Sequence, residues 1–359
     1  MQPWLHHGVM SAASPGGPRR RRWLIGLGVV LLAAAIGVPV ALRLTRPASM
    51  PLPLSTVATV PLPGGSSRFD YADVDPVAHR LFVAHMGDGT LLALDTKTDR
   101  VLATVPDLAS VTGVIVVPEL HRVFASAAGT GQVITINEDT AAVLARAPAG
   151  KFPDGLAYVP STGQVWVSDE DGGTETVLDA RTGEPVATVP LGGEAGNVRY
   201  DPQSDRVLVD VQTRDEIAVI DPHTRSVTSR AAVPGCNHDH GLLIADGRAF
   251  VACDGNDVLV TLALPAMKPL GHLDVGAGPD VLAADPQRGL LYVAAESGDV
   301  TTVDIGPAAG RVTGRAHLAD NAHVVAVDHT TGRAYFPVPD IGGGRPRLLI
   351  TAPIPPSGQ

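Results

Sequence analysis

The chain repeats itself every 40 to 44 residues. Seven segments share one pattern, and they begin at Asp70, Thr112, Asp154, Gly196, His240, Asp280 and His323. In each segment a short apolar run ends at a turn such as Asp75-Pro76, and further short runs follow, separated by turns rich in Gly and Thr. Four short strands in about 42 residues is the size of one blade of a β-propeller. The period therefore predicts an all-β fold, a seven-bladed β-propeller.

The two ends of the repeat region predict how the ring closes. Residues 55–62, STVATVPL, match the fourth strand of a blade, yet they precede the first complete repeat. The seventh repeat supplies only three strands and ends in RLLITAPI. We therefore expect the amino-terminal strand to close the last blade, which leaves no sheet edge open. The expected propeller covers residues 54–355 and is followed by a short tail at 356–359.

A long apolar segment precedes the propeller. Residues 23–42, WLIGLGVVLLAAAIGVPVAL, carry no charge, and a helix of that length spans the hydrocarbon core of a membrane, about 30 Å. Four arginines at 19–22 precede it and only Arg43 and Arg46 follow, so the amino end should stay in the cytoplasm. We predict a single transmembrane helix that acts as a signal anchor in the cytoplasmic membrane. A cleaved signal peptide is the alternative.

This anchor sets the expected organisation of the whole chain. Residues 1–22 form a disordered basic cytoplasmic tail, residues 43–53 a Pro-rich tether, and the propeller is extracytoplasmic. After residue 46 the chain holds 21 Lys and Arg against 37 Asp and Glu. This excess of negative charge repels phosphate backbones, so we expect no nucleic acid among the partners.

The repeat units resemble the YVTN-repeat propellers, the YncE-like family. The likeness rests on VAHMGDGTLLALDTKTDRVLATV and its copies, and it covers the whole predicted propeller. The positions of the family's tetrad read Phe82-Val-Ala-His85 in one copy and Trp166-Val-Ser-Asp169 in another, so the family's Asn is missing here. The resemblance implies the fold but no activity, because propellers host many unrelated functions.

The family framework also implies which residues share a face. The first strand of each blade lines the central axis, and it begins on the face where the second strand ends. The wider ring at the ends of the second strands includes His85 and Asp169, and one residue later come Met86, Glu170, Gln212, Asp254 and Glu296. We predict a ligand-binding site at the channel mouth from Asp70, Thr112, Asp154, Asn197, His240, Asp280, His323, His85 and Asp169.

Part of this ring has the chemistry of a metal site. Converging carboxylates repel one another unless water, a histidinium or a bound cation offsets them. Oxygen and imidazole ligands together suit Ca²⁺, Mn²⁺ or Zn²⁺. The candidate ligands of a divalent metal ion are Asp70, Asp154, His240, Asp280 and His323. The alternative is a water-filled opening in which Asp and Thr side chains close turns by binding backbone N–H groups.

Both cysteines of the chain lie in one repeat, in CNHDHGLLIADGRAFVAC. Cys236 precedes a first strand and Cys253 ends the antiparallel neighbour of that strand, so a disulfide is the preferred interpretation in an oxidising compartment. Because side chains alternate along an extended segment, Cys236, His238 and His240 would share one side, and a Zn²⁺ or copper site with Cys253 is an alternative. Two free thiols are the third possibility.

No catalytic signature accompanies the fold: the sequence has no nucleophile elbow, no Walker motif and no haem-attachment motif. We therefore predict a membrane-anchored extracytoplasmic module that binds a small ligand or an envelope protein through the polar ring. A metal-dependent lactonase or hydrolase that uses the same ring is one alternative. A structural scaffold of the cell envelope is another.

Overall fold

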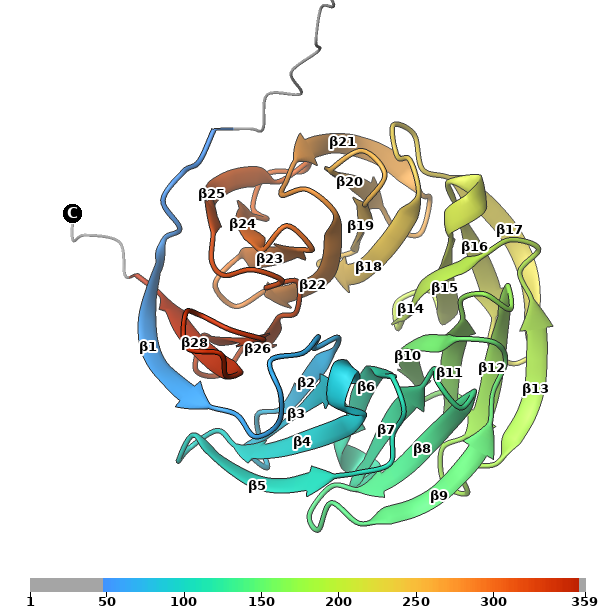
Figure 1. Ribbon diagram of the computed structural model, residues 1–359. Helices are drawn as coiled ribbons and strands as arrows, with labels where there is room; N and C mark the ends of the chain where they lie inside the picture. Colours follow the sequence, from blue (N-terminus) through green and yellow to red (C-terminus); the bar gives the residue numbers. More distant parts are fainter. Residues whose placement is uncertain (1–47, 355–359) are drawn as a thin grey trace, which may run out of the picture. The chain divides into compact units, whose positions relative to one another are not determined.

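The computed structural model describes residues 48–354, all of which belong to one compact unit. The unit consists of seven four-stranded antiparallel sheets. Figure 1 shows the sheets arranged around a common centre, with the first strand of each sheet innermost. This confirms the predicted all-β, seven-bladed propeller.

The strands follow one another from the centre of each blade to its rim. The first blade holds β2 (Ala72–Asp75), β3 (Arg80–His85), β4 (Thr90–Asp95) and β5 (Arg100–Val105), and the second holds β6 (Val111–Val117), β7 (Arg122–Ala127), β8 (Gln132–Asn137) and β9 (Val143–Pro148). The third holds β10 (Pro153–Val159), β11 (Gln164–Asp169), β12 (Thr174–Asp179) and β13 (Pro185–Pro190), and the fourth holds β14 (Ala195–Asp201), β15 (Arg206–Val211), β16 (Glu216–Asp221) and β17 (Ser226–Ala232).

The remaining blades repeat this order. The fifth holds β18 (Asp239–Ala245), β19 (Arg248–Cys253), β20 (Val258–Ala263) and β21 (Lys268–Asp274), and the sixth holds β22 (Pro279–Asp285), β23 (Leu290–Ala295), β24 (Asp299–Asp304) and β25 (Arg311–His317). The seventh holds β26 (Ala326–Asp328), β27 (Arg333–Val338), β28 (Arg347–Pro353) and β1 (Leu54–Pro61). Short 3₁₀ turns occupy Met86–Asp88, Pro118–Leu120 and Gln212–Arg214.

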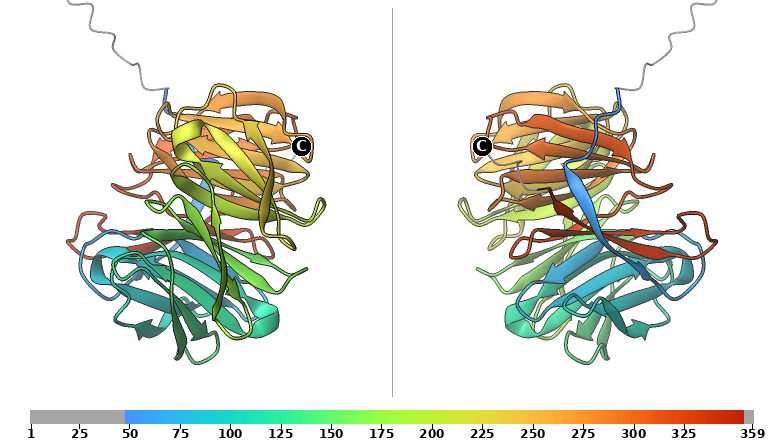
Figure 2. Two further views of the ribbon diagram at one scale, coloured as in Figure 1. Left: turned by 90° about the vertical axis from the view of Figure 1, so that its right-hand side faces the viewer. Right: turned by 90° about the vertical axis from the view of Figure 1, so that its left-hand side faces the viewer.

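The seventh blade joins the two ends of the domain. Strand β1 pairs antiparallel with β28, so that Leu54 lies opposite Pro353 and Pro61 opposite Arg347. The right-hand view of Figure 2 shows β1 running along the outside of this blade. The expected closure by the amino-terminal strand is thus confirmed.

One position of the second strand builds the core between blades. The third residue of each second strand is large and at most 1% exposed: Phe82, Phe124, Trp166, Leu208, Phe250, Tyr292 and Tyr335. Side chains of that size bury the most apolar surface per residue and dominate core energetics. Their recurrence explains why a chain with few aromatic residues still packs seven sheets in register.

The predicted anchor at 23–42 lies outside the described residues, as do the tail at 1–22 and the first part of the tether. Within residues 48–354, no helix has the length and apolar character needed to cross a membrane.

Candidate functional site

The candidate residues lie where the innermost strands begin. Thr112, Asp154, His240 and Asp280 are each the second residue of a first strand. In all four of these strands the pairing register shifts just after the strand begins, which locally interrupts the ladder. An irregularity of this kind bends a strand and re-aims a side chain. The first strands thereby turn polar groups toward the axis instead of into the packing between sheets.

Glycines beside these residues bring neighbouring blades together. A Cβ on Gly113 would collide with the carbonyl oxygen of Asp154, and a Cβ on Gly241 would collide with that of Asp280. Only a residue without a Cβ allows such a close backbone approach. The close contact of the first strands keeps the ring of polar side chains narrow.

A cavity of about 300 Å³ opens at this end of the channel, and we call it the mouth cavity. Of the predicted site residues, Asp70, Asp154, His240 and Asp280 line it. The residues that follow the second strands also line it: Met86, Glu170, Gln212, Asp254 and Glu296. Side chains from five of the seven blades, the first and the third to the sixth, therefore converge on one small volume.

Asp280 is the centre of the ion pairs in the mouth cavity. Its Oδ1 lies 3.2 Å from Nε2 of His240, and its Oδ2 lies 3.8 Å from Nη2 of Arg68 and 3.9 Å from Nε2 of His323. Burial alone would raise the pKa of Asp280, but the hydrogen bond and charge of His240 outweigh it and hold the pKa below its usual range. Asp280 is therefore the anion that compensates three cationic groups.

The neighbouring carboxylates raise the pKa of both histidines of the ring. Burial lowers the pKa of His240, yet the carboxylates of Asp280, Asp154 and Glu170 raise it well above its usual value. His323 behaves likewise, since Asp70 and Asp280 overcome its burial and raise its pKa. Nδ1 of His240 lies 3.0 Å from Oε1 of Gln212, which fixes the orientation of the ring. Both imidazoles thus act as partners of the acids.

Arg68 is a member of the site that the repeat pattern did not reveal. Its Nη2 lies 3.1 Å from Oδ1 of Asp70 and 2.7 Å from Oε1 of Glu296. Burial lowers its pKa, but Asp70, Glu296 and Asp280 raise it above the usual arginine value. Arg68 precedes the first strand by four residues, in the connection from β1 to β2, which is longer than the equivalent connections between the other blades. Its only signal in the sequence was its place two residues before Asp70.

Two acids of the cavity are left without a cationic partner. Across residues 48–354, no nitrogen of Lys, Arg or His lies within ion-pair distance of the Asp154 carboxylate or of the Glu170 carboxylate, and no hydrogen bond reaches the carboxylate of Asp154, which is 4% exposed. Glu170 receives a single long hydrogen bond of 3.4 Å from Nε2 of Gln212. Burial raises the pKa of both acids, and the charge of Asp70 adds to the effect on Asp154. The acids Asp70, Asp280 and Glu296 of the cavity therefore have cationic partners, whereas Asp154 and Glu170 have none within ion-pair distance among residues 48–354.

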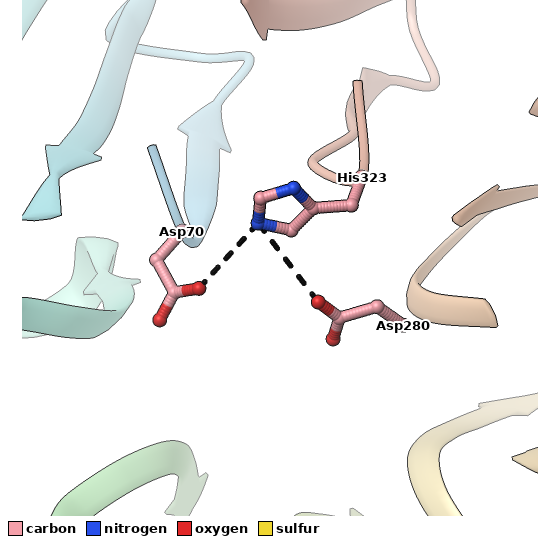
Figure 3. Close-up of side chains that lie close together, drawn as sticks. All are labelled: Asp70, Asp280 and His323. Atoms are coloured by element: carbon pink, nitrogen blue, oxygen red, sulfur yellow. Dashed lines mark ion pairs between the residues drawn. The ribbon is translucent and has the colours of Figure 1, made fainter. Parts of the chain in front are cut away.

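The geometry groups three potential metal ligands. Single ligand atoms of Asp70, Asp280 and His323 lie within 4.8 Å of one another, and all three residues are buried. Figure 3 shows Nε2 of His323 facing a carboxylate oxygen of each Asp. The donor types fit a divalent ion, but Arg68 is already 3.1 Å from Asp70 and 3.8 Å from Asp280. A cation placed there would have to displace or tolerate that guanidinium.

The other predicted site residues lie elsewhere. Thr112 donates to the carbonyl oxygen of Pro153 (2.8 Å) and so joins two blades. Asn197 donates to the hydroxyl of Tyr71 (2.6 Å) below the cavity. His85 is stacked on Phe69 with 4.1 Å between ring centroids and contacts Oγ of Ser67 at 3.0 Å. None of the three lines the mouth cavity. His323 does not line it either; it is fully buried behind the wall, where it reaches Asp70 and Asp280.

Asp169 also faces the protein rather than the cavity. Its carboxylate accepts hydrogen bonds of 2.8 Å from the backbone N–H of Gly150 and from the hydroxyls of Thr174 and Thr176. Because side chains alternate along a strand, the end of a second strand points into the sheet packing while the next residue, Glu170, points to the cavity.

The predicted disulfide is confirmed between Cys236 and Cys253, whose Cα atoms are 5.4 Å apart. The alternative metal site on these cysteines was wrong, because both sulfurs are consumed by the bond. His238 and His240 instead contact Asp254 (2.7 Å) and Asp280 (3.2 Å). The bridge ties the loop before β18 to the end of β19.

Comparison with known proteins finds similar folds among solved structures. No family model matches the chain, and no curated protein matches it either. Among solved structures, hydrazine synthase of Kuenenia stuttgartiensis is similar with a TM-score of 0.65 and 15% identity, over 79% of this chain and 94% of the other. The structure of U3-55K is similar with a TM-score of 0.69 and 12% sequence identity, over 82% of this chain and 98% of the other. The WD40 repeats of RRP9 are similar with a TM-score of 0.70 and 12% sequence identity, over 83% of this chain and 99% of the other. At these identities the likeness shows a β-propeller fold alone.

Proposed function

We propose that this chain is an extracytoplasmic binding module, anchored in the cytoplasmic membrane through residues 23–42, whose mouth cavity binds a small ligand that carries positive charge. The observation behind this proposal is that two acids on the wall of the cavity, Asp154 and Glu170, have no cationic partner among the described residues. Unpaired buried carboxylates are costly in a folded protein. A ligand cation between them would supply the missing partner.

The charges of the cavity favour this class of ligand. Arg68, His240 and His323 are committed to Asp70, Asp280 and Glu296. Binding an anion would require breaking these pairs, whereas an ammonium group needs only the two free acids. The rings of Tyr71 and Phe152 also line the cavity, and an aromatic face attracts a cation.

Ligands that share a four-carbon chain and differ in charge test this function. Putrescine, butylamine and 1,4-butanediol carry two, one and no ammonium groups. We expect affinity for the full-length chain, measured by calorimetry, to fall in that order. Because an ammonium group would lower the raised pKa of Asp154 and Glu170, binding should release protons, and the observed enthalpy should change with the ionisation enthalpy of the buffer.

The matching variants are Asp154→Asn and Glu170→Gln. Each should weaken putrescine binding by about tenfold or more, the value of a charge-assisted hydrogen bond. Asp171→Asn is the control, since Asp171 is exposed, pairs with Lys151 at 2.8 Å and does not line the cavity. Equal affinity for putrescine and butanediol would exclude the proposed ligand class.

A metal-dependent hydrolase remains the second candidate, favoured by the cluster of Asp70, Asp280 and His323. It predicts that Ca²⁺, Mn²⁺ or Zn²⁺ raises the melting temperature of the wild-type chain and that Asp70→Asn removes this shift. The absence of a shift with all three ions would reject it. A scaffold role has weaker support, because the exposed apolar residues of the outer strands lie on separate blades, Leu102 and Val186 singly and Val143 and Leu144 as one neighbouring pair.

The location and the family are part of the same proposal. A disulfide is typical of an oxidising compartment, which agrees with an exported propeller. Val77 is 83% exposed, so a Val77→Cys variant should react with a membrane-impermeant thiol reagent on intact cells that express the full-length chain; an unlabelled cysteine would contradict export. Membership of the YVTN-repeat propellers is proposed from the repeat residues alone.

A further inference from the structure

A second cavity occupies the other end of the channel, and we call it the far cavity. Its volume is about 560 Å³, and residues from all seven first strands line it. Its lining residues lie further along these strands than those of the mouth cavity, as Asp73 does relative to Asp70. Tyr71 lines both cavities, and its hydroxyl accepts a hydrogen bond from Asn197. Tyr71 therefore lies between two separate sites.

The walls of the far cavity are mostly apolar. Side chains such as Val116, Leu156 and Leu282 line it, and among the described residues only Asp73 and Arg199 bring a charge to it. A pocket of this size with apolar walls and few polar groups is typical of sites for small organic ligands. The two charged groups then decide which ligand fits.

Asp73 already has its partners. Its Oδ1 accepts a hydrogen bond from the N–H of Val74 (2.9 Å), and its Oδ2 accepts one from the N–H of Val116 (2.7 Å) in the neighbouring blade. Burial raises its pKa to about 6. The carboxylate therefore joins two blades and needs no ligand.

Arg199 is different, because its charge has no direct counter-charge. Its Nη1 donates to the carbonyl oxygen of Val198 (2.7 Å) and, at 3.5 Å, to Oδ1 of Asn197, and both acceptors are neutral. No carboxylate of residues 48–354 lies within ion-pair distance of it. Burial lowers its pKa, as expected for a charge that is incompletely compensated. Since a guanidinium has five N–H donors, several remain for a ligand.

We propose that the far cavity binds a small carboxylic acid with an apolar body, with its carboxylate on Arg199 and its body against the apolar walls. The planar guanidinium matches a carboxylate in a two-pronged geometry, and desolvation of the apolar body supplies further affinity. This site does not depend on the function proposed for the mouth cavity.

Octanoate and octanamide test the proposal on the full-length chain, because they share a body and differ in charge. Calorimetry should show octanoate binding about 10- to 100-fold more tightly than octanamide, the range for hydrogen bonds to a charged group. Arg199→Met should reduce octanoate affinity by a similar factor, and Arg199→Lys should reduce it less. Arg146→Met is the control, since Arg146 is exposed and donates only to the carbonyl oxygen of Asp107 (3.0 Å).

Three results would overturn the proposal: octanoate that does not bind, octanoate that binds no better than octanamide, or octanoate affinity that Arg199→Met leaves unchanged. If Arg199→Met fails to fold, the comparison of the two ligands on the wild-type chain decides alone. Putrescine bound at the mouth should not displace octanoate, so failure at one cavity can be told from failure at the other.

Discussion

Replacing Asp280 by Asn removes the charge at the centre of the mouth cavity and keeps the shape of the side chain. The wild-type carboxylate lies 3.2 Å from Nε2 of His240 and within 4 Å of both Arg68 and His323. Its side chain is 8% exposed, so water cannot take over its role. The Asp280→Asn variant leaves three cationic groups short of one anion, and of these His323 is fully buried and His240 largely so.

The expected loss of stability follows from that geometry. Removing one partner of a buried ion pair costs about 3–5 kcal/mol. Arg68 and His323 keep Asp70 and Glu296 as partners, so the loss should be near the lower end, about 3 kcal/mol. His240 has only Asp280 within ion-pair distance among the described residues, and its pKa should fall most.

The pH dependence has a definite sign. The folded state raises the pKa of His240, so its contribution to stability is complete below the unfolded pKa, about 6.5, and is lost as the pH rises through the folded pKa. Asp280 has a lowered pKa, so its contribution is present above about pH 3.9 and is lost as the pH falls through its folded pKa. The difference between wild type and Asp280→Asn should therefore be largest near pH 6 and shrink at higher pH.

Urea unfolding at several pH values, with NMR titration of the histidines, measures both effects. Asp254→Asn is the matched control: Asp254 contacts His238 at 2.7 Å, but their side chains are 37% and 39% exposed. Such a pair contributes about 1 kcal/mol or less. If Asp280→Asn costs no more than Asp254→Asn, or if the pKa of His240 does not move, the central role assigned to Asp280 is wrong.

Two further predictions concern the framework. Replacing Cys236 and Cys253 by Ala should lower the free energy of unfolding by about 3 kcal/mol, because the bridge closes a loop of 17 residues; scanning calorimetry measures the shift, and an unchanged transition would contradict it. Gly113→Ala should cost about 1–3 kcal/mol through its clash with the carbonyl of Asp154. Gly343→Ala, where a Cβ meets nothing within 4 Å, should stay within about 0.5 kcal/mol of wild type.

Much of the fold was predictable because it repeats. Seven copies of a unit of about 42 residues give the number of blades. The extra strand at the amino end and the strand missing from the seventh repeat together predict the closure. The disulfide was predictable for a related reason, since the repeat places Cys236 just before the first strand of a blade and Cys253 at the end of the neighbouring second strand. The anchor at 23–42 stays a prediction, as it lies outside the described residues.

The site was harder to predict, since a repeat aligns residues but does not orient their side chains. Asp154 and His240 face the mouth cavity, whereas Thr112, at the same repeat position, bonds to the backbone of the next blade. The strands of all three residues have a register shift, so the shift does not separate these outcomes. Thr112 differs because its short hydroxyl reaches the carbonyl oxygen of Pro153, and sequence periodicity does not contain such a contact. The sequence analysis did not identify Arg68 because it lies two residues before the first repeat segment begins. It did not identify Arg199 because that residue lies inside a strand that was expected to belong to the core.

The pairing of β1 with β28 affects how the domain reaches its final state. Leu54 and Pro353 are about 300 residues apart in the chain yet face each other in one sheet, and bringing such distant points together costs about 5 kcal/mol of chain entropy. During synthesis the first six blades can assemble in order, whereas the seventh must wait for the carboxyl end to emerge. Deleting either β1 or β28 would therefore disrupt the same blade and expose a strand edge that could pair with a second molecule.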